Sequence, residues 1–144
     1  MEITNIAEED LAELAELYQQ LQANKPSVEK MRETLLRVGE DSNHVMLGAR
    51  IDGQLVGTLL GVACQMLFGQ CKSFMVVEDV VVSNDYRRRG VGRALMREIE
   101  ERAAQLNCSY VMLITDHDRL GAHGFYESLG YKTDAYKAFK KSIL

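Results

Sequence analysis

Apolar residues recur at spacings of three and four along the first part of the chain, which is the spacing of a helix with one buried face. The first run predicts an amphipathic helix over residues 8–22, with an apolar stripe of Leu11, Leu14, Leu17, Tyr18 and Leu21. A second run predicts a helix over residues 28–39, for which Ser27 is the expected N-cap. With a short strand expected over residues 2–6, the chain begins as one strand followed by two helices.

The pattern then changes to that of strands. The segments "HVMLGARI" and "QLVGTLLGVACQML" flank Asp52 and Gly53, a dipeptide that suits the two-residue turn of a β-hairpin. A further strand, "SFMVVEDVVVS", follows a turn at Gly69. Its nearly continuous valines are typical of a strand buried on both faces, so we expect it in the middle of a sheet.

Helix and strand patterns alternate in the rest of the chain. A helix is expected from about Gly90, then a strand "YVMLIT", a helix over residues 120–129, and "YKTDAYKAFKKSI" as a final strand or hairpin. This order predicts an α/β (α+β mixed) fold, a mixed sheet with helices on both faces, in a single domain spanning residues 1–144. The helix from Gly90 would be a crossover, which makes the strands before and after it parallel neighbours.

Composition narrows the function classes. The chain has 144 residues, 47% of them hydrophobic and 26% charged, which describes an ordinary globular domain. Its net charge of -4 argues against nucleic acid or an anionic membrane as a partner. No leader peptide or membrane span is predicted, so we expect a cytoplasmic protein. The three cysteines form no CxxC pair, and no metal site is expected.

One basic segment has a specific chemical meaning. Arg87, Arg88 and Arg89 precede Gly90 and Gly92, at the junction of a central strand and a helix N-terminus. Free backbone N–H groups and the helix dipole favour an anion at such a junction, and arginines add charge that suits a pyrophosphate. A run of arginines is also common in a solvated turn.

Two familiar nucleotide-binding motifs do not fit the segment. A Walker A loop needs GxxxxGK[ST], which is absent, and the dinucleotide motif GxGxxG fails because Leu95 stands at its third glycine. The run from Arg87 to Gly92 instead resembles the [Q/R]-x-x-G-x-[G/A] loop of the GCN5-related N-acetyltransferase (GNAT) superfamily. The strand before it, the helix after it, "YVMLIT" and "AHGFYESLGY" are similar to that family in order and spacing, over residues 74–132.

The resemblance implies a fold and an activity. The expected sheet is mixed and mostly antiparallel, with a central parallel strand pair that splays apart. The expected enzyme is an N-acetyltransferase, an acyltransferase that moves an acetyl group from acetyl-CoA, its co-substrate, directly to a primary amine. By the same resemblance, the coenzyme is bound by Val80, Val81 and Val82 along a strand and by Arg87, Arg88, Arg89, Gly90, Val91, Gly92 and Arg93 in the loop.

The resemblance also implies catalytic residues. Tyr126, in "FYESLGY", is expected to touch the coenzyme and to protonate the leaving thiolate, although it would also suit a purely packing role. Glu78 is the candidate base or amine contact. Asp79 and Asp116 are candidate substrate contacts. Strand alternation places Glu78 and Asp79 on opposite faces unless a bulge intervenes. The pair resembles that of glucosamine-phosphate acetyltransferases of the superfamily.

The acceptor remains open at the level of sequence. The segment "TDHDRLGAHGFY" resembles branches that acetylate small primary amines, so we expect an amino sugar, an aminoalkyl compound or a similar molecule. The acceptor site is expected near the first two helices and residues 64–73. A protein or peptide N-acetyltransferase and a non-catalytic acyl-CoA-binding regulatory module are the alternatives. Family members often dimerise, so a homodimer is also left open.

Overall fold

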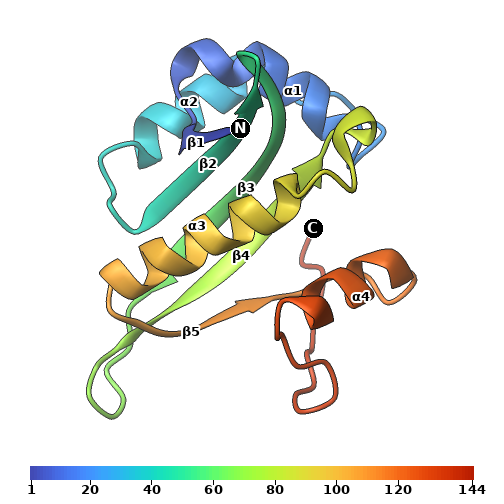
Figure 1. Ribbon diagram of the computed structural model, residues 1–144. Helices are drawn as coiled ribbons and strands as arrows, with labels where there is room; N and C mark the ends of the chain where they lie inside the picture. The colour runs from blue at the N-terminus through green and yellow to red at the C-terminus, as the bar shows by residue number, and fades with distance from the viewer. The chain divides into compact units, whose positions relative to one another are not determined.

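A computed structural model describes all of residues 1–144, which form two compact units, residues 1–112 and 113–144. The single domain expected from the sequence stays a prediction. Figure 1 labels the elements. In chain order they are β1 (Glu2–Asn5), η1 (Glu8–Asp10), α1 (Leu11–Tyr18), α2 (Val28–Val38), β2 (His44–Ile51), β3 (Gln54–Cys64), β4 (Ser73–Val82), η2 (Asn84–Tyr86), α3 (Val91–Gln105), β5 (Cys108–Leu113) and α4 (Leu120–Ser128).

The sheet has five strands in the order β1-β2-β3-β4-β5. The first three neighbouring pairs are antiparallel, and β4 and β5 are parallel, which confirms the mixed sheet expected from the sequence. The turn between β2 and β3 consists of Asp52 and Gly53, with φ values of 51° and 81°. Both positive values match the turn type that best continues the twist of two hairpin strands.

Helices cover both faces of the sheet. Helix α3 lies on one face, where its side chains approach the backbone of β3 closely: a Cβ on Gly61 would lie 2.5 Å from Ile99 Cδ1. Helix α1 lies on the other face, and Leu11, Leu14 and Leu17 form a buried cluster there together with Val81 of β4. The glycine on β3 therefore sets how closely α3 packs on the sheet.

The first two helices differ in how well the pattern predicted them. Helix α1 ends at Tyr18 rather than near Gln22, because the next amides bond to carbonyls three residues back, Gln20 N to Leu17 O at 3.1 Å and Leu21 N to Tyr18 O at 3.0 Å. Ser27 caps α2 as expected, its Oγ accepting from Lys30 N at 3.4 Å. No helix combines the length and the apolar character that crossing a membrane requires.

The final strand or hairpin predicted from "YKTDAYKAFKKSI" was wrong. Helix α4 ends as expected at a turn around Gly130, whose φ is 93°, but no residue after it is in a strand. A strand needs a partner for its backbone and a surface for its apolar side chains. The apolar side chains of this segment are instead exposed: Tyr136 by 79%, Phe139 by 85% and Ile143 by 84%.

Gly61→Ala should destabilise the protein. Its new methyl group would lie 2.5 Å from Ile99 Cδ1 and 2.9 Å from Met75 Sδ, and both of these side chains are fully buried. Overpacking of this kind costs about 1–3 kcal/mol in the free energy of unfolding, which urea denaturation followed by circular dichroism would measure. The control is Gly124→Ala in α4, whose added methyl meets no atom within 4 Å. An unchanged stability for Gly61→Ala would contradict the described packing of α3.

Candidate functional site

A β-bulge interrupts the pairing of β3 with β4. Thr58 pairs with Val81 and Leu60 pairs with Glu78, so Leu59 stands opposite two residues, Asp79 and Val80. Asp79 has a φ of 54°, in the left-handed region. The extra residue reverses the alternation of faces along β4. The opposite-face placement of Glu78 and Asp79 that simple alternation predicts therefore does not apply here. Both residues are exposed overall, although the Asp79 carboxyl itself is partly shielded from water.

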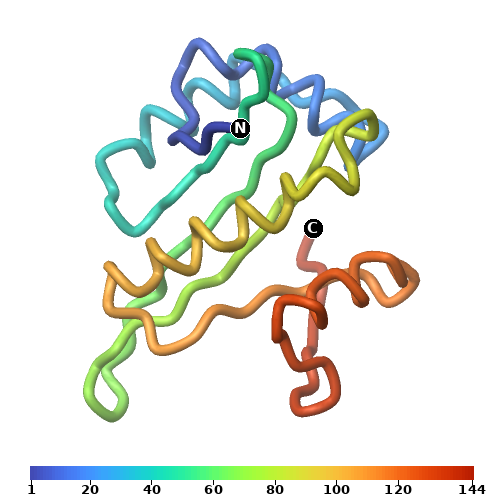
Figure 2. Tube along the Cα trace, viewed as in Figure 1, coloured from blue at the N-terminus to red at the C-terminus, as the bar shows by residue number.

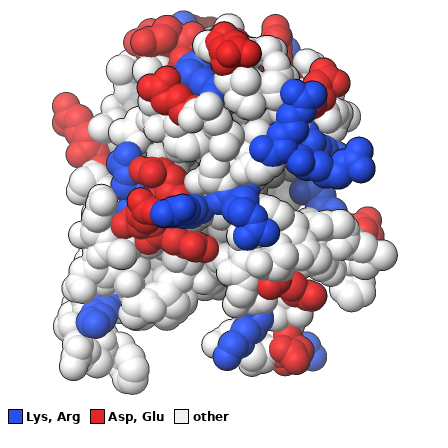
Figure 3. All heavy atoms as spheres, viewed as in Figure 1, with Lys and Arg blue, Asp and Glu red and all other residues white.

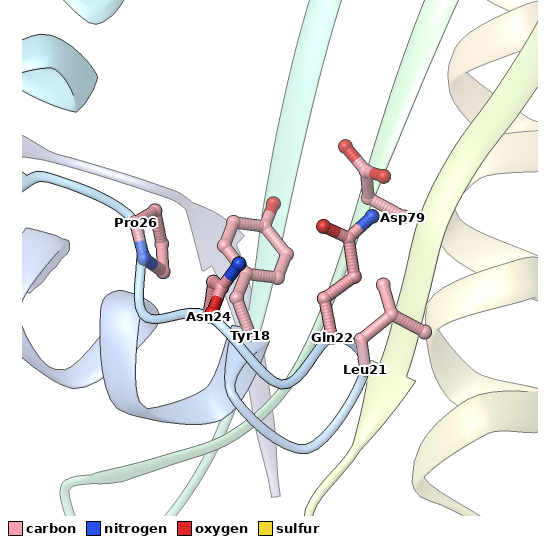
Figure 4. A pocket seen from close by; sticks show the side chains of 6 residues that line it. All are labelled: Tyr18, Leu21, Gln22, Asn24, Pro26 and Asp79. Carbon is pink, nitrogen blue, oxygen red and sulfur yellow. The ribbon is translucent and has the colours of Figure 1, made fainter.

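A cavity of about 220 Å³ opens beside the bulge. Figure 4 shows the Tyr18 hydroxyl and the Asp79 carboxylate toward the same side of this space, with the Gln22 amide between α1 and the strand. The cavity is thus made where α1 ends, where the connection to α2 passes, and where β4 bulges. Its lining residues are Tyr18, Leu21, Gln22, Asn24, Pro26 and Asp79.

Burial sets the protonation of the two acidic groups in the cavity. It raises the pKa of Tyr18 to about 12, helped by the negative charge of Asp79 and opposed by a hydrogen bond with Thr58. Burial also raises the pKa of Asp79 above its ordinary value. Tyr18 is therefore a neutral phenol at physiological pH, and the Asp79 carboxylate is incompletely hydrated and gains from a cationic partner.

The turn between β4 and α3 has the geometry of an anion site. Arg88 and Gly90 have φ values of 61° and 82°, and Gly90 is the N-cap of α3 without a side chain to cap it. The first amides of the helix, at Val91 and Gly92, are therefore left for solvent or a ligand. Figure 2 shows the chain passing from β4 through this turn into α3, and Figure 3 shows Lys and Arg side chains gathered over this part of the molecule.

Side chains tie this turn to the rest of its unit. Arg87 Nε donates to Val82 O at 3.4 Å, and the Arg89 guanidinium lies 5.1 Å from the centre of the Tyr86 ring. Asn84 N donates to Gln20 Oε1 at 2.9 Å. Gln20 lies two residues after the end of α1, so this bond joins the start of the turn between β4 and α3, here called the basic turn, to the segment that lines the cavity.

Strand β5 is shorter than the strand it pairs with. Near their beginnings, Ser109 Oγ donates to Ser73 O at 3.3 Å and the rings of Phe74 and Tyr110 stack at 5.3 Å. From this register, β5 ends at Leu113, about level with Val77. The last part of β4, which includes Val80, Val81 and Val82, continues beyond the end of β5.

Tyr126 and Asp116 belong to the second unit. Tyr126 lies on α4 with its ring 5.1 Å from that of Phe125, and burial raises the pKa of its phenol while the Arg119 guanidinium opposes this. The backbone carbonyl of Asp116 lies 3.1 Å from His123 Nε2. The catalytic role of Tyr126 and the substrate contact of Asp116 stay predictions, as does the role of Glu78, which does not line the cavity.

The sequence named Asp79 as a candidate substrate contact, and Asp79 lines the cavity, but the sequence did not point to the other lining residues. Tyr18 was assigned to the apolar stripe of a longer helix, and the stripe gives no sign that its hydroxyl faces a carboxylate. The segment over residues 64–73, expected to wall the acceptor site, contributes no lining residue, and Phe68 in it is 86% exposed. The structure holds no group of three or more His, Cys, Asp or Glu residues arranged to bind a metal ion.

Asp79→Asn should flatten part of the pH dependence of stability. Because the pKa of Asp79 is raised in the folded protein, the folded state binds its proton more tightly than the unfolded state does. Stability is thus lost as pH rises from the unfolded pKa of about 4 through the raised value, and the variant escapes this loss. Urea midpoints across that range would show it, with Asp52→Asn, a change at another positive-φ aspartate, as the control. Parallel curves for wild type and Asp79→Asn would contradict the burial of this carboxyl.

Comparison with known proteins identifies the family of this chain. A model of the Acetyltransferase (GNAT) family matches residues 9–131. A putative acetyltransferase from Agrobacterium tumefaciens str. C58 is similar with a TM-score of 0.90 and 26% identity, over 99% of each chain. A glucosamine-6-phosphate N-acetyltransferase from Arabidopsis thaliana shares the fold, with a TM-score of 0.85 and 19% identity over 97% of each chain.

Curated relatives match over shorter stretches. An uncharacterized protein of Bacillus subtilis (strain 168), YdhI, is 33% identical over 55 residues, which are 38% of this chain and 34% of that protein. The chain thus spans about a third of the length of this relative. The family model, by contrast, covers most of the chain and includes β4, the basic turn and α4. This chain belongs to the Acetyltransferase (GNAT) family.

Proposed function

We propose that this protein is an acetyl-CoA-dependent N-acetyltransferase whose acceptor is a small primary amine. The observation that carries the proposal is the strand, turn and helix over residues 73–105, in a chain that belongs to this family. A positive φ at Arg88 and Gly90 and an uncapped α3 together suit a pyrophosphate. The residues present therefore fit acetyl-CoA as the co-substrate.

In this proposal the coenzyme lies along the end of β4. Val80, Val81 and Val82 offer backbone groups to the pantetheine arm, as an added strand would use them, since β4 continues past the end of β5. The pyrophosphate meets the basic turn at the other end of the arm. The amides of Arg88, Arg89, Gly90, Val91, Gly92 and Arg93 supply donors, and the side chains of Arg87, Arg88 and Arg89 supply charge.

The reaction transfers the acetyl group in one displacement. The amine nitrogen bonds to the thioester carbonyl carbon, and the backbone N–H near Val80 donates to the oxyanion that forms. The carbon–sulfur bond then breaks, and its electron pair leaves with the sulfur. We assign the proton that this thiolate takes up to the phenol of Tyr126, whose pKa is raised by burial, so that it remains protonated at physiological pH.

The amine must lose a proton to become a nucleophile. We assign the base to Glu78, which is exposed on β4 directly before the bulge, and the holding of the amine to Asp79, which lines the cavity. Asp116 of the second unit is a further proposed substrate contact. The volume of the cavity, about 220 Å³, supports a small amine as the acceptor. Pockets for drug-sized ligands have volumes of about 300–1,000 Å³.

Turnover with a panel of amines tests this function and the role of Tyr126. Purified protein should release free CoA from acetyl-CoA in the presence of one or more small primary amines and yield the N-acetyl product by mass spectrometry. Tyr126→Phe should lower kcat roughly 100-fold or more, the range expected when a general acid is removed, with little change in acetyl-CoA binding. Tyr136→Phe, at a ring that is 79% exposed, is the matched control.

Two results would count against the proposal. Acetylation of peptides but of no small amine would show that the acceptor is a peptide rather than a small molecule. A protein that neither binds acetyl-CoA nor releases CoA with any acceptor would remove the activity itself. If Tyr126→Phe retained the kcat of the wild type, only the proton donor would have to be reassigned.

A further inference from the structure

We propose that the cavity between Tyr18 and Asp79 binds the ammonium group of a compact amine that carries no phosphate or carboxylate near that group. The inference rests on the proposed function and makes its acceptor more specific. The acceptor in this inference carries a net positive charge, unlike a phosphorylated or zwitterionic amine.

The charges around the cavity carry the argument. The lining contains one carboxylate, Asp79, and no lysine or arginine. Lys25 lies beside the lining in sequence, but its ammonium is 3.8 Å from Glu16 Oε1 on α1. An acceptor with a phosphate group would bring further negative charge beside Asp79, in a site partly shielded from water and without a cation to compensate it.

The polar atoms suit the three N–H donors of an ammonium group. The Tyr18 phenol oxygen has two lone pairs, and its hydrogen bond with Thr58 takes at most one of them. The phenol oxygen then keeps a lone pair for the ligand, and Asp79 offers two carboxylate oxygens. Figure 4 shows these oxygen atoms on the same side of the cavity.

The rest of the lining describes the remainder of the acceptor. The side-chain amides of Gln22 and Asn24 both donate and accept hydrogen bonds, which matches hydroxyl groups better than it matches a charge. Leu21 and Pro26 supply apolar wall. Together with the small volume, this lining fits a short hydroxylated amine or the amino end of a longer one.

The state of Asp79 gives independent support. Burial raises the pKa of this carboxyl, so an empty cavity holds a carboxylate with incomplete hydration. A bound ammonium would compensate that loss and return the pKa toward its ordinary value. An anionic group in the same place would raise the pKa further.

Matched pairs of amines test the inference. The probes are 2-aminoethanol against its phosphate ester, and glucosamine against glucosamine 6-phosphate. Binding of each amine is measured by calorimetry on the full chain without acetyl-CoA, and KM and kcat are measured with it. We expect the unphosphorylated member of at least one pair to bind at least about 10-fold more tightly and to have the lower KM. A 10-fold difference in affinity corresponds to the free energy of one hydrogen bond to a charged group.

Variants locate the effect in the cavity. Asp79→Asn should weaken binding of the cationic probe roughly 10- to 100-fold and reduce or remove the preference over its phosphate ester. Tyr18→Phe should weaken binding of the same probe while the far-ultraviolet circular dichroism stays unchanged. Asp52→Asn, the same charge change at a remote turn with positive φ, should leave both affinities as they are in the wild type.

The outcomes separate this inference from the function on which it rests. A preference for the phosphorylated probes, no measurable binding of any cationic probe, or wild-type affinity in Asp79→Asn would overturn the inference, even if the enzyme acetylates other amines. Failure of the proposed function would appear differently, as amine binding with the expected charge preference but without release of CoA from acetyl-CoA.

Discussion

The extra residue in β4 opposite Leu59 is the constraint on which the candidate site depends. Without it, Asp79 would take the regular alternation of the strand. With it, the strand bends, Asp79 adopts a φ of 54°, and its carboxylate lines a cavity that α1 and its following turn complete. A left-handed backbone at a residue other than glycine has an energetic cost, and such positions persist where the surrounding structure imposes them. Here the paired segments of β3 and β4 on both sides of the bulge impose it.

Packing on the face of the sheet that α3 covers positions the basic turn between β4 and α3. Val91, Leu95 and Ile99 of α3 press against the glycines of β3, so the start of the helix is fixed relative to the strand before it. The turn from Asn84 to Gly90 then has little freedom, and the bond from Asn84 N to Gln20 Oε1 connects it to the cavity segment. One compact unit, residues 1–112, thus carries both the proposed phosphate contact and the proposed acceptor contact at Asp79.

The sequence predicted the elements whose signals are local. The Asp52-Gly53 turn, the Ser27 cap and the turn at Gly90 each depend on a few adjacent residues, and the structure confirms all three. The bulge at Asp79 was considered but not predicted, because it depends on the register of two strands that are distant along the chain. The failed C-terminal strand has the same cause, because a strand needs a partner elsewhere in the chain and the residues of the segment alone do not supply one.

The clearest test of the account is hydrogen–deuterium exchange of backbone amides with and without acetyl-CoA. The account predicts slower exchange on binding at residues 80–82 and 88–93, where the strand end and the basic turn meet the coenzyme, with little change in β1 and β2. Protection confined to other segments, or no protection at saturating acetyl-CoA, would contradict it.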